Sequence, residues 1–222
     1  MNVYLFDIDG TLISSGGAGK AALEAALASE FGICHVIDKV QLSGRTDRAI
    51  LFDLVRHAGL GDAADAWGRL RRAYLRHLPD CLDRSSGRIL PGIAEFLASV
   101  HGRDDVLLGL LTGNIRDGAR IKLGHFGIDH YFTVGGFGDD HLDRDDVARE
   151  ALREVRRRLS GAICLEQVWV IGDTPLDIRC ARAIGARVAA VATGWHTLAD
   201  LAVHQPDLLL RDFSEFRPLL GD

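Results

Sequence analysis

The chain has 222 residues, 47% of them hydrophobic, and a formal net charge of −5 at pH 7. This length suits one large domain or a core with an insert, and the apolar share is ample for a buried core. The negative net charge does not indicate a nucleic-acid-binding protein, and no apolar run is long enough to predict a membrane span. The four cysteines have no C-x-x-C spacing, and the apolar run at residue 3 leaves no room for a signal peptide. We therefore expect a cytoplasmic protein without a zinc or disulfide framework.

An apolar run at residues 3–6 ends at Asp7, and a second carboxylate, Asp9, stands two positions on, before Gly10. Such a run predicts a buried strand of a parallel sheet. Open α/β sheets bind ligands at the carboxyl ends of their strands. Because residues i and i+2 of an extended chain point the same way, Asp7 and Asp9 can serve one substrate together.

Apolar residues at helical spacing predict three helices before the next strand, at 20–31, 48–58 and 63–78. Turn residues at 85–87 and 91–92 mark the end of this region. The sequence therefore predicts a helical insert over residues 14–85, which leaves residues 1–13 and 86–222 for the core.

Strands and helices then alternate along the chain. The apolar runs predict strands at 106–111, 131–134, 168–171, 187–192 and 207–210, and helices at 93–100, 115–126, 145–159 and 175–184. Alternation of this kind predicts an α/β fold, in which a Rossmann-like parallel sheet carries helices on both faces.

Polar groups follow two of these later strands. Thr112-Gly113-Asn114 comes after the strand at 106–111, and Asp173 comes after the strand at 168–171. Asp7 and Asp173 suit Mg²⁺, which prefers carboxylate oxygens, waters and a substrate phosphate oxygen. Asp177 could hold a metal-bound water or cap the helix that Thr174 begins, or do both.

The D-x-D-G-T segment at residues 7–11, Thr112, Lys122 and the acids at 173 and 177 resemble, in order, the motifs of the haloacid dehalogenase superfamily. The resemblance is to its phosphoglycolate phosphatase-like members, and it spans essentially the whole chain. It implies that the insert is a helical C1 cap, which closes over the site. An acid at position 9 favours phosphoryl transfer, because the dehalogenases of this superfamily lack it.

The resemblance also implies a role for each site residue. Asp7 would be the nucleophile that forms an aspartyl-phosphate, and Asp9 would protonate the leaving alcohol and then activate water. The remaining implied assignments are Thr112, Gly113, Asn114 and Lys122 around the phosphoryl group, and Asp7, Asp9 through its backbone carbonyl, Asp173 and Asp177 around Mg²⁺.

The position of the basic residue departs from the family pattern. Many capped members carry a lysine in a Lys-Pro segment after the third strand, and residues 135–144 contain none. Lys122, as the only lysine between residue 40 and the C-terminus, takes that role by elimination, and Arg144 is a weaker substitute. Asp139 and Asp140 could line the metal side, or could be solvated loop acids.

We expect a Mg²⁺-dependent phosphatase acting on a small phosphorylated metabolite such as phosphoglycolate, as a monomer or homodimer. A β-phosphoglucomutase-type transferase shares the same motifs, and a receiver-like signalling domain also combines acids, Thr and Lys on a parallel sheet. In the predicted cap, Arg45 could contact a carboxylate or hydroxyl of the substrate. The alternative for the segment 43–47 is a solvated turn.

Overall fold

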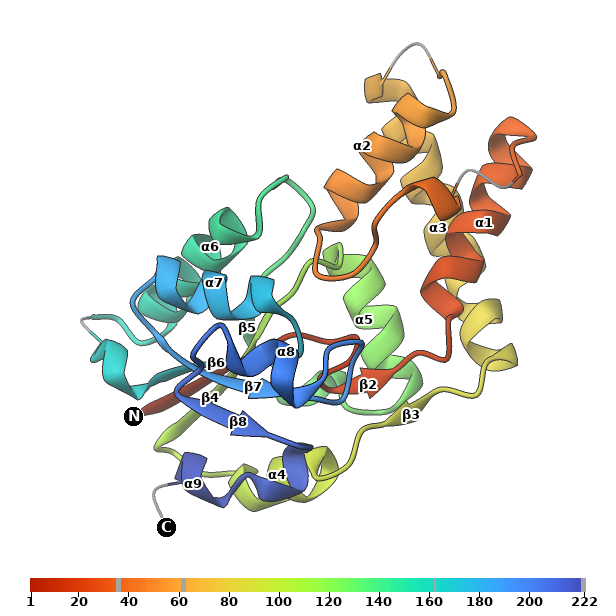
Figure 1. The fold of residues 1–222 in the computed structure, drawn as a ribbon. Helices are drawn as coiled ribbons and strands as arrows, with labels where there is room; N and C mark the ends of the chain where they lie inside the picture. Colours follow the sequence, from red (N-terminus) through yellow and green to blue (C-terminus); the bar gives the residue numbers. More distant parts are fainter. Residues whose placement is uncertain (35–36, 61–62, 162, 221–222) are drawn as a thin grey trace.

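A parallel sheet forms the centre of the molecule, and three helices stand above one end of it (Figure 1). The computed structural model describes residues 1–34, 37–60, 63–161 and 163–220. Its main sheet has six strands in the order β5-β4-β1-β6-β7-β8, and every neighbouring pair is parallel. The strands are β1 (Asn2–Phe6), β4 (Val106–Leu111), β5 (Val134–Gly136), β6 (Val168–Gly172), β7 (Arg187–Val191) and β8 (Leu208–Leu210). The predicted Rossmann-like α/β fold is confirmed.

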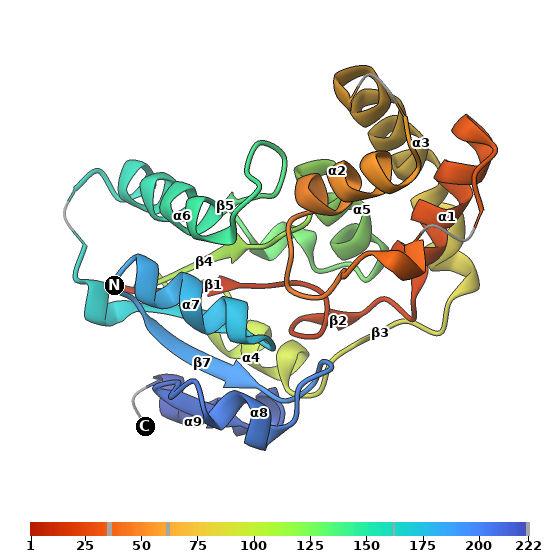
Figure 2. The ribbon, with the colours of Figure 1, turned by 45° about the horizontal axis from the view of Figure 1, so that its top comes forward.

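Helices cover both faces of this sheet (Figures 1 and 2). Alternate residues of β1 point to opposite faces, so Tyr4 packs against Phe96 on one side and Leu5 belongs to the apolar cluster on the other. The first face carries α4 (Ile93–Val100), α5 (Arg116–His125) and α9 (Arg217–Leu220), and the second carries α6 (Arg144–Arg158), α7 (Pro175–Ala183) and α8 (Leu198–Ala202). Short 3₁₀ turns occupy Ile37–Lys39, Asp129–Tyr131, Leu165–Gln167 and Phe213–Glu215.

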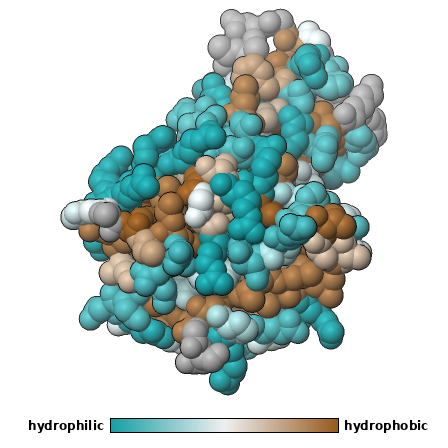
Figure 3. Space-filling model, turned by 60° about the vertical axis from the view of Figure 1, so that its left-hand side comes forward, coloured by the Kyte–Doolittle hydropathy of each residue, from teal (hydrophilic) through white to brown (hydrophobic). Residues whose placement is uncertain are grey.

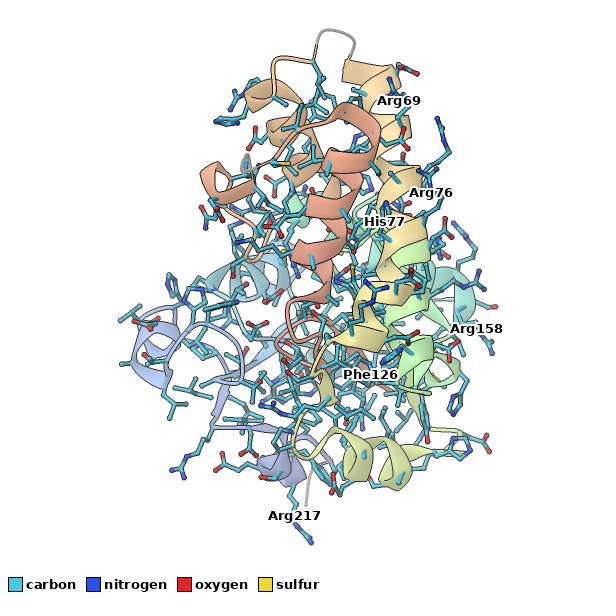
Figure 4. The ribbon with its side chains drawn as sticks, turned by 90° about the vertical axis from the view of Figure 1, so that its right-hand side faces the viewer. Arg69, Arg76, His77, Phe126, Arg158 and Arg217 are labelled. Carbon is cyan, nitrogen blue, oxygen red and sulfur yellow. The ribbon has the colours of Figure 1, made fainter. Side chains whose placement is uncertain are left out.

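The three helices above the sheet are α1 (Ala18–Phe31), α2 (Asp47–His57) and α3 (Ala63–Arg84), and they share an apolar cluster of their own. Figure 4 shows Arg69, Arg76 and His77 along α3, beside α1. Both arginines pair with Glu30 at the end of α1, with N–O distances of 3.6 and 2.5 Å. These contacts hold α1 against α3, so the predicted helical region is one packed unit.

The chain leaves and re-enters the core side by side. Strands β2 (Ile13–Ser14) and β3 (Arg88–Ile89) form a small antiparallel pair at this junction. Phe126, labelled in Figure 4, packs against both the apolar cluster of the sheet and that of the three helices. The exact domain limits at 13/14 and 85/86 stay a prediction, and they fall beside this pair of strands.

Two predicted elements differ from the structure. The strand expected at 131–134 lies at Val134–Gly136, after a 3₁₀ turn. Glycine is rare in strands, so the sequence pattern did not indicate a strand here. A Cβ on Gly136 would lie 2.3 Å from Val147 O in α6, and the packing therefore requires glycine. Helix α3 also continues through Pro79 to Arg84, and its buried Leu82 belongs to the same apolar cluster as the preceding turns.

The surface mixes hydrophilic and hydrophobic groups on the face drawn in Figure 3, where part of the three-helix unit projects above the core. Among the helices of the described ranges, none has both the length and the apolar character needed to cross a membrane.

Candidate active site

Asp7 and Asp9 stand where β1 ends, at the centre of the sheet. The backbone N–H of Asp7 donates to Ile171 O at 2.9 Å, which ties this end of β1 to β6. Gly10 then turns the chain with φ +86°, and a Cβ there would lie 2.5 Å from Asp173 Oδ2. Only glycine therefore allows the two acidic strand ends to come this close.

Asp7, Asp173 and Asp177 form a buried acidic cluster. Each offers one carboxylate oxygen, and these three oxygens lie within 4.8 Å of one another. Asp173 accepts a hydrogen bond from Thr11 Oγ1 at 3.2 Å. Three converging carboxylates are a donor set that suits a hard divalent cation such as Mg²⁺.

Asp177 also caps α7, which is one of the two roles predicted for it. Its Oδ2 accepts from the backbone N–H and the hydroxyl of Thr174, at 3.0 and 2.7 Å, and the backbone N–H of Asp177 donates back to that hydroxyl. This capping box confirms the helix start. Contact of Asp177 with a metal-bound water stays a prediction.

Arg144, the first residue of α6, is the cation beside this cluster. It is 3% exposed, its Nη1 lies 3.6 Å from Asp7 Oδ2, and its Nη2 donates to Asp177 Oδ1 and, at 3.4 Å, to Leu111 O. When all are ionised, the three carboxylates and this one guanidinium leave two negative charges. A divalent cation bound there would balance these two charges.

The pKa values of these acids reflect the same imbalance. Burial raises the pKa of Asp7 to about 6, against the lowering effect of Arg144. Burial raises the pKa of Asp173 to about 8, and the charges of Asp177 and Asp7 add to the shift. A divalent cation would reverse both effects, because it stabilises the ionised carboxylates.

Lys122 lies beside Asp9. Its Nζ donates to Asp9 Oδ2 at 2.5 Å and to Asn114 Oδ1 at 2.6 Å. Asn114 Nδ2 donates to Asp9 Oδ2 and to Thr112 Oγ1, both at 3.0 Å. These hydrogen bonds join the loop after β1, the loop after β4 and α5. The two predicted basic residues lie beside different acids, Lys122 beside Asp9 and Arg144 beside Asp7.

The Asp9–Lys122 pair is held in its ionised form. Although burial works to raise the pKa of Asp9, the charge of Lys122 and its hydrogen bond bring that pKa below its ordinary value. Burial works to lower the pKa of Lys122, but the charges of Asp9, Tyr74 and Asp47 and the hydrogen bond to Asp9 together raise it above its ordinary value. Asp7 and Asp9 therefore have pKa values shifted in opposite directions.

A cavity of about 720 Å³ lies between the core and the three helices. From the core, it is lined by Asp7, Asp9, Gly113, Asn114, Lys122, Arg144 and Asp173, and from the three-helix unit by Leu23, Arg45, Asp47, Ile50 and Tyr74. Three of the carboxylates named above, those of Asp7, Asp9 and Asp173, and both cations thus share one cavity with side chains of the three helices.

Arg45 lies on the wall of this cavity, as the sequence suggested for a substrate-reading residue. Its Nη2 is 2.8 Å from Asp53 Oδ2, and its Nη1 donates to Gln41 O at 3.3 Å. The guanidinium is therefore held in place by α2 and the loop before it. A contact between Arg45 and substrate stays a prediction.

Several contacts that fasten the three helices to the core had no signal in the sequence. Asp47 accepts from Ile115 N at 2.8 Å, and its own N–H donates to Gly113 O at 2.7 Å. Arg71 of α3 lies 3.2 Å from Asp139 Oδ1, whose other oxygen accepts from Arg116 N at 2.7 Å. Partners so far apart in the sequence leave no periodic pattern.

Neither predicted alternative describes Asp139, because it pairs with Arg71 of α3: it lies outside the described acidic cluster and is not a freely solvated acid. Asp140 is 89% exposed at its side chain, and its Oδ1 lies 3.9 Å from Arg48 Nη1.

Comparisons with known proteins agree with this geometry. The sequence pattern of the haloacid dehalogenase-like hydrolases matches residues 4–182. The chain is 31% identical to a phosphoglycolate phosphatase of Synechococcus elongatus, over 97% of this chain and 95% of that protein. It is 26% identical to a phosphoglycolate phosphatase of Salmonella typhimurium, over 97% of this chain and 91% of that one.

Solved structures share the fold over almost the whole chain. CbbY from Rhodobacter sphaeroides in complex with phosphate matches with a TM-score of 0.76 at 20% identity, covering 98% of this chain and 96% of that one. A predicted phosphoglycolate phosphatase from Haemophilus somnus matches with a TM-score of 0.73 at 19% identity, covering 99% and 98%. The chain therefore belongs to the haloacid dehalogenase-like hydrolases and is an enzyme similar to the phosphoglycolate phosphatases.

Proposed function

We propose that this protein is a Mg²⁺-dependent phosphatase that hydrolyses a small phosphorylated metabolite through an aspartyl-phosphate on Asp7. The observation that carries the proposal is the buried cluster of Asp7, Asp173 and Asp177, of which Asp7 and Asp173 line one cavity together with Asp9. Its two uncompensated negative charges call for a divalent cation. The names of the relatives point to an acidic substrate such as phosphoglycolate.

In this proposal Asp7 and Asp173 would hold Mg²⁺ directly, with the backbone carbonyl of Asp9, and Asp177 would act through a water. The ion would neutralise part of the phosphate charge. This matters because a carboxylate and a phosphate dianion repel by roughly 4 kcal/mol per pair of unit charges at about 4 Å and an effective dielectric near 20.

The chain supplies the remaining chemistry. A carboxylate oxygen of Asp7 attacks phosphorus and the bond to the alcohol oxygen breaks, while Asp9 gives that oxygen its proton. Asp9 then takes a proton from the water that hydrolyses the aspartyl-phosphate. The lowered pKa of Asp9 suits this second step. The negative charge of a bound phosphate opposes that lowering and so favours the protonated acid in the first step.

Arg144, Thr112 and Gly113 would hold the phosphoryl oxygens. Asn114 is also predicted to bind them, but its side-chain amide donates to Asp9 and Thr112 instead. Arg144 is already beside Asp7, and a guanidinium matches phosphate geometry with paired donors. Phosphate binding by Lys122 was expected from the family resemblance, but its observed partners are Asp9 and Asn114.

The three helices of residues 14–85 would act as the cap that reads the leaving group. The core surrounds the phosphate, so the rest of the substrate faces the cavity wall formed by Arg45, Ile50 and Tyr74. Arg45 would bind a carboxylate or hydroxyl there, and the site would then favour acidic metabolites.

A screen of phosphorylated metabolites for release of inorganic phosphate, with and without Mg²⁺, tests this function. We expect release only with Mg²⁺ and best with small acidic monoesters. Transfer to a sugar hydroxyl without free phosphate would instead identify a β-phosphoglucomutase-type transferase. Equal release in excess chelator would contradict the proposal.

A further inference from the structure

One oxygen of Asp9 is held by two donors at once. Asp9 Oδ2 accepts from Lys122 Nζ at 2.5 Å and from Asn114 Nδ2 at 3.0 Å. Lys122 also donates to Asn114 Oδ1 at 2.6 Å, so the three side chains form a closed triangle. Asn114 is fixed in turn by its bond to Thr112 Oγ1.

We propose that Lys122 is a positioning residue for Asp9, and that it works together with Asn114. This rests on the proposed function, in which Asp9 is the acid and base. With Oδ2 held by the two donors, Oδ1 is the oxygen that exchanges a proton with the leaving alcohol and with water. The carboxylate cannot turn without breaking two bonds, one of them to a charged group.

The surroundings of the two residues fit this division of labour. The Lys122 side chain is only 6% exposed, whereas that of Asp9 is 39% exposed and lines the cavity. Helix α1 lies over the ammonium, since a Cβ on Gly19 would be 3.5 Å from Lys122 Nζ. A bond shielded from water in this way is stronger than an exposed one and holds its geometry better.

Lys122 is not needed as a cation at the phosphate, because Arg144 already supplies one there. It lies 3.6 Å from the proposed nucleophile Asp7, whereas the recorded ion pair of Lys122 is with Asp9. Each of the two acids thus has a cation of its own. A positioning role predicts that loss of Lys122 harms proton transfer, and that it leaves phosphate binding intact.

The dependence of kcat/KM on the leaving group separates these roles. The aryloxide of an activated aryl phosphate leaves without help from a general acid, whereas the alkoxide of an alkyl phosphate needs a proton. In Lys122→Met we expect kcat/KM to fall about 100-fold for an alkyl phosphate, and by less than about threefold for para-nitrophenyl phosphate. Inhibition by inorganic phosphate should be unchanged. Arg120→Met, which removes an exposed cation from the same helix, should change neither substrate.

An equal loss on both substrates, together with weaker inhibition by inorganic phosphate, would overturn the proposal and return Lys122 to the phosphoryl group. Full activity of Lys122→Met on both substrates would also overturn the proposal. If the wild-type enzyme hydrolyses no phosphate monoester, that result would instead contradict the proposed function itself.

Lys122→Met leaves Asp9 without its cation and could fail to fold. A second comparison avoids the unpaired acid, because the side chain at position 9 is neutral both in Asp9→Asn and in Asp9→Asn/Lys122→Met. If Lys122 acts only through Asp9, the double variant retains the kcat/KM of Asp9→Asn for alkyl phosphates. A further loss of more than about tenfold would show a separate role for Lys122 and overturn the proposal.

Discussion

The guanidinium of Arg144 lies 3.6 Å from the carboxylate of Asp7, and both side chains are almost completely buried. Asp9, two residues on, pairs with Lys122 instead. The two acids consequently have pKa values moved in opposite directions, that of Asp7 up to about 6 and that of Asp9 down. Two carboxylates with different environments can perform different chemical tasks in one site.

Asp7→Asn should abolish phosphate release while the fold persists. Asparagine is nearly the same size but has no anionic oxygen to attack phosphorus. The measurement is steady-state phosphate release, with circular dichroism and a thermal melt as controls for folding. Retention of more than a trace of activity would show that another residue is the nucleophile.

Activity should require Mg²⁺, and Ca²⁺ should not replace it. Ca²⁺ takes more oxygen ligands and would draw both oxygens of Asp7 into coordination, which leaves none to attack. Asp173→Asn should raise the Mg²⁺ concentration needed for half-maximal activity by about tenfold or more. Titration of chelator-treated enzyme with each ion measures this. An unchanged Mg²⁺ requirement in Asp173→Asn would place the ion elsewhere.

Mg²⁺ should stabilise the protein more at about pH 8 than at about pH 5. The folded-state pKa values of Asp7 and Asp173, about 6 and about 8, lie above their ordinary value of 3.8. Their contribution to stability is therefore fully present below about pH 4, and it is lost as the pH rises through 6 and 8. Mg²⁺ binds the ionised carboxylates, so it offsets this loss where it is largest.

Thermal melts of metal-free and Mg²⁺-loaded protein across this pH range give the difference directly. The same series on Asp173→Asn is the control, and its Mg²⁺ effect should be smaller at high pH. An Mg²⁺-induced shift of equal size at both pH values would show that the acidic cluster is not where the ion binds.

Arg45→Ala should lower kcat/KM for the best acidic substrate by about 10- to 100-fold, the value of a charge-assisted hydrogen bond. The effect on para-nitrophenyl phosphate should stay within about twofold, because that substrate has no carboxylate. Arg56→Ala is a matched control, since Arg56 also pairs with Asp53, at 3.2 Å, but is exposed. Equal small effects of Arg45→Ala on both substrates would make Arg45 a structural residue of the cap.

Asp139→Ala should raise KM by about three- to tenfold, because it removes the carboxylate that Arg71 of α3 and the N–H of Arg116 share. Increasing salt should raise KM of the wild type by screening this pair, and should affect the variant less. Asp140→Ala is the neighbouring control, with a side chain 89% exposed. If both variants behave like the wild type, the contact does not hold the cap over the site.

The parallel sheet, the three-helix region and the acids at the strand ends could all be predicted from the sequence. Each depends on local signals, namely apolar runs, helical spacing and turn residues. The strand at Val134–Gly136 was misplaced because glycine is rare in strands, and only the packing of Gly136 against α6 and of Gly135 against β4 shows why glycine stands there.

The sequence by itself also determined which chemical groups the site contains, because Asp7, Asp9, Thr112 and Asp173 each follow a strand of the same parallel sheet. Only the tertiary structure decided how the charges pair. Lys122 is 113 residues from Asp9, and Arg144 is 33 residues from Asp177. Such pairings depend on the direction in which each helix leaves the sheet, and electrostatic energy depends on distance in space. The sequence therefore supplied two cations and four acids, and the fold paired Lys122 with Asp9 and Arg144 with Asp7 and Asp177.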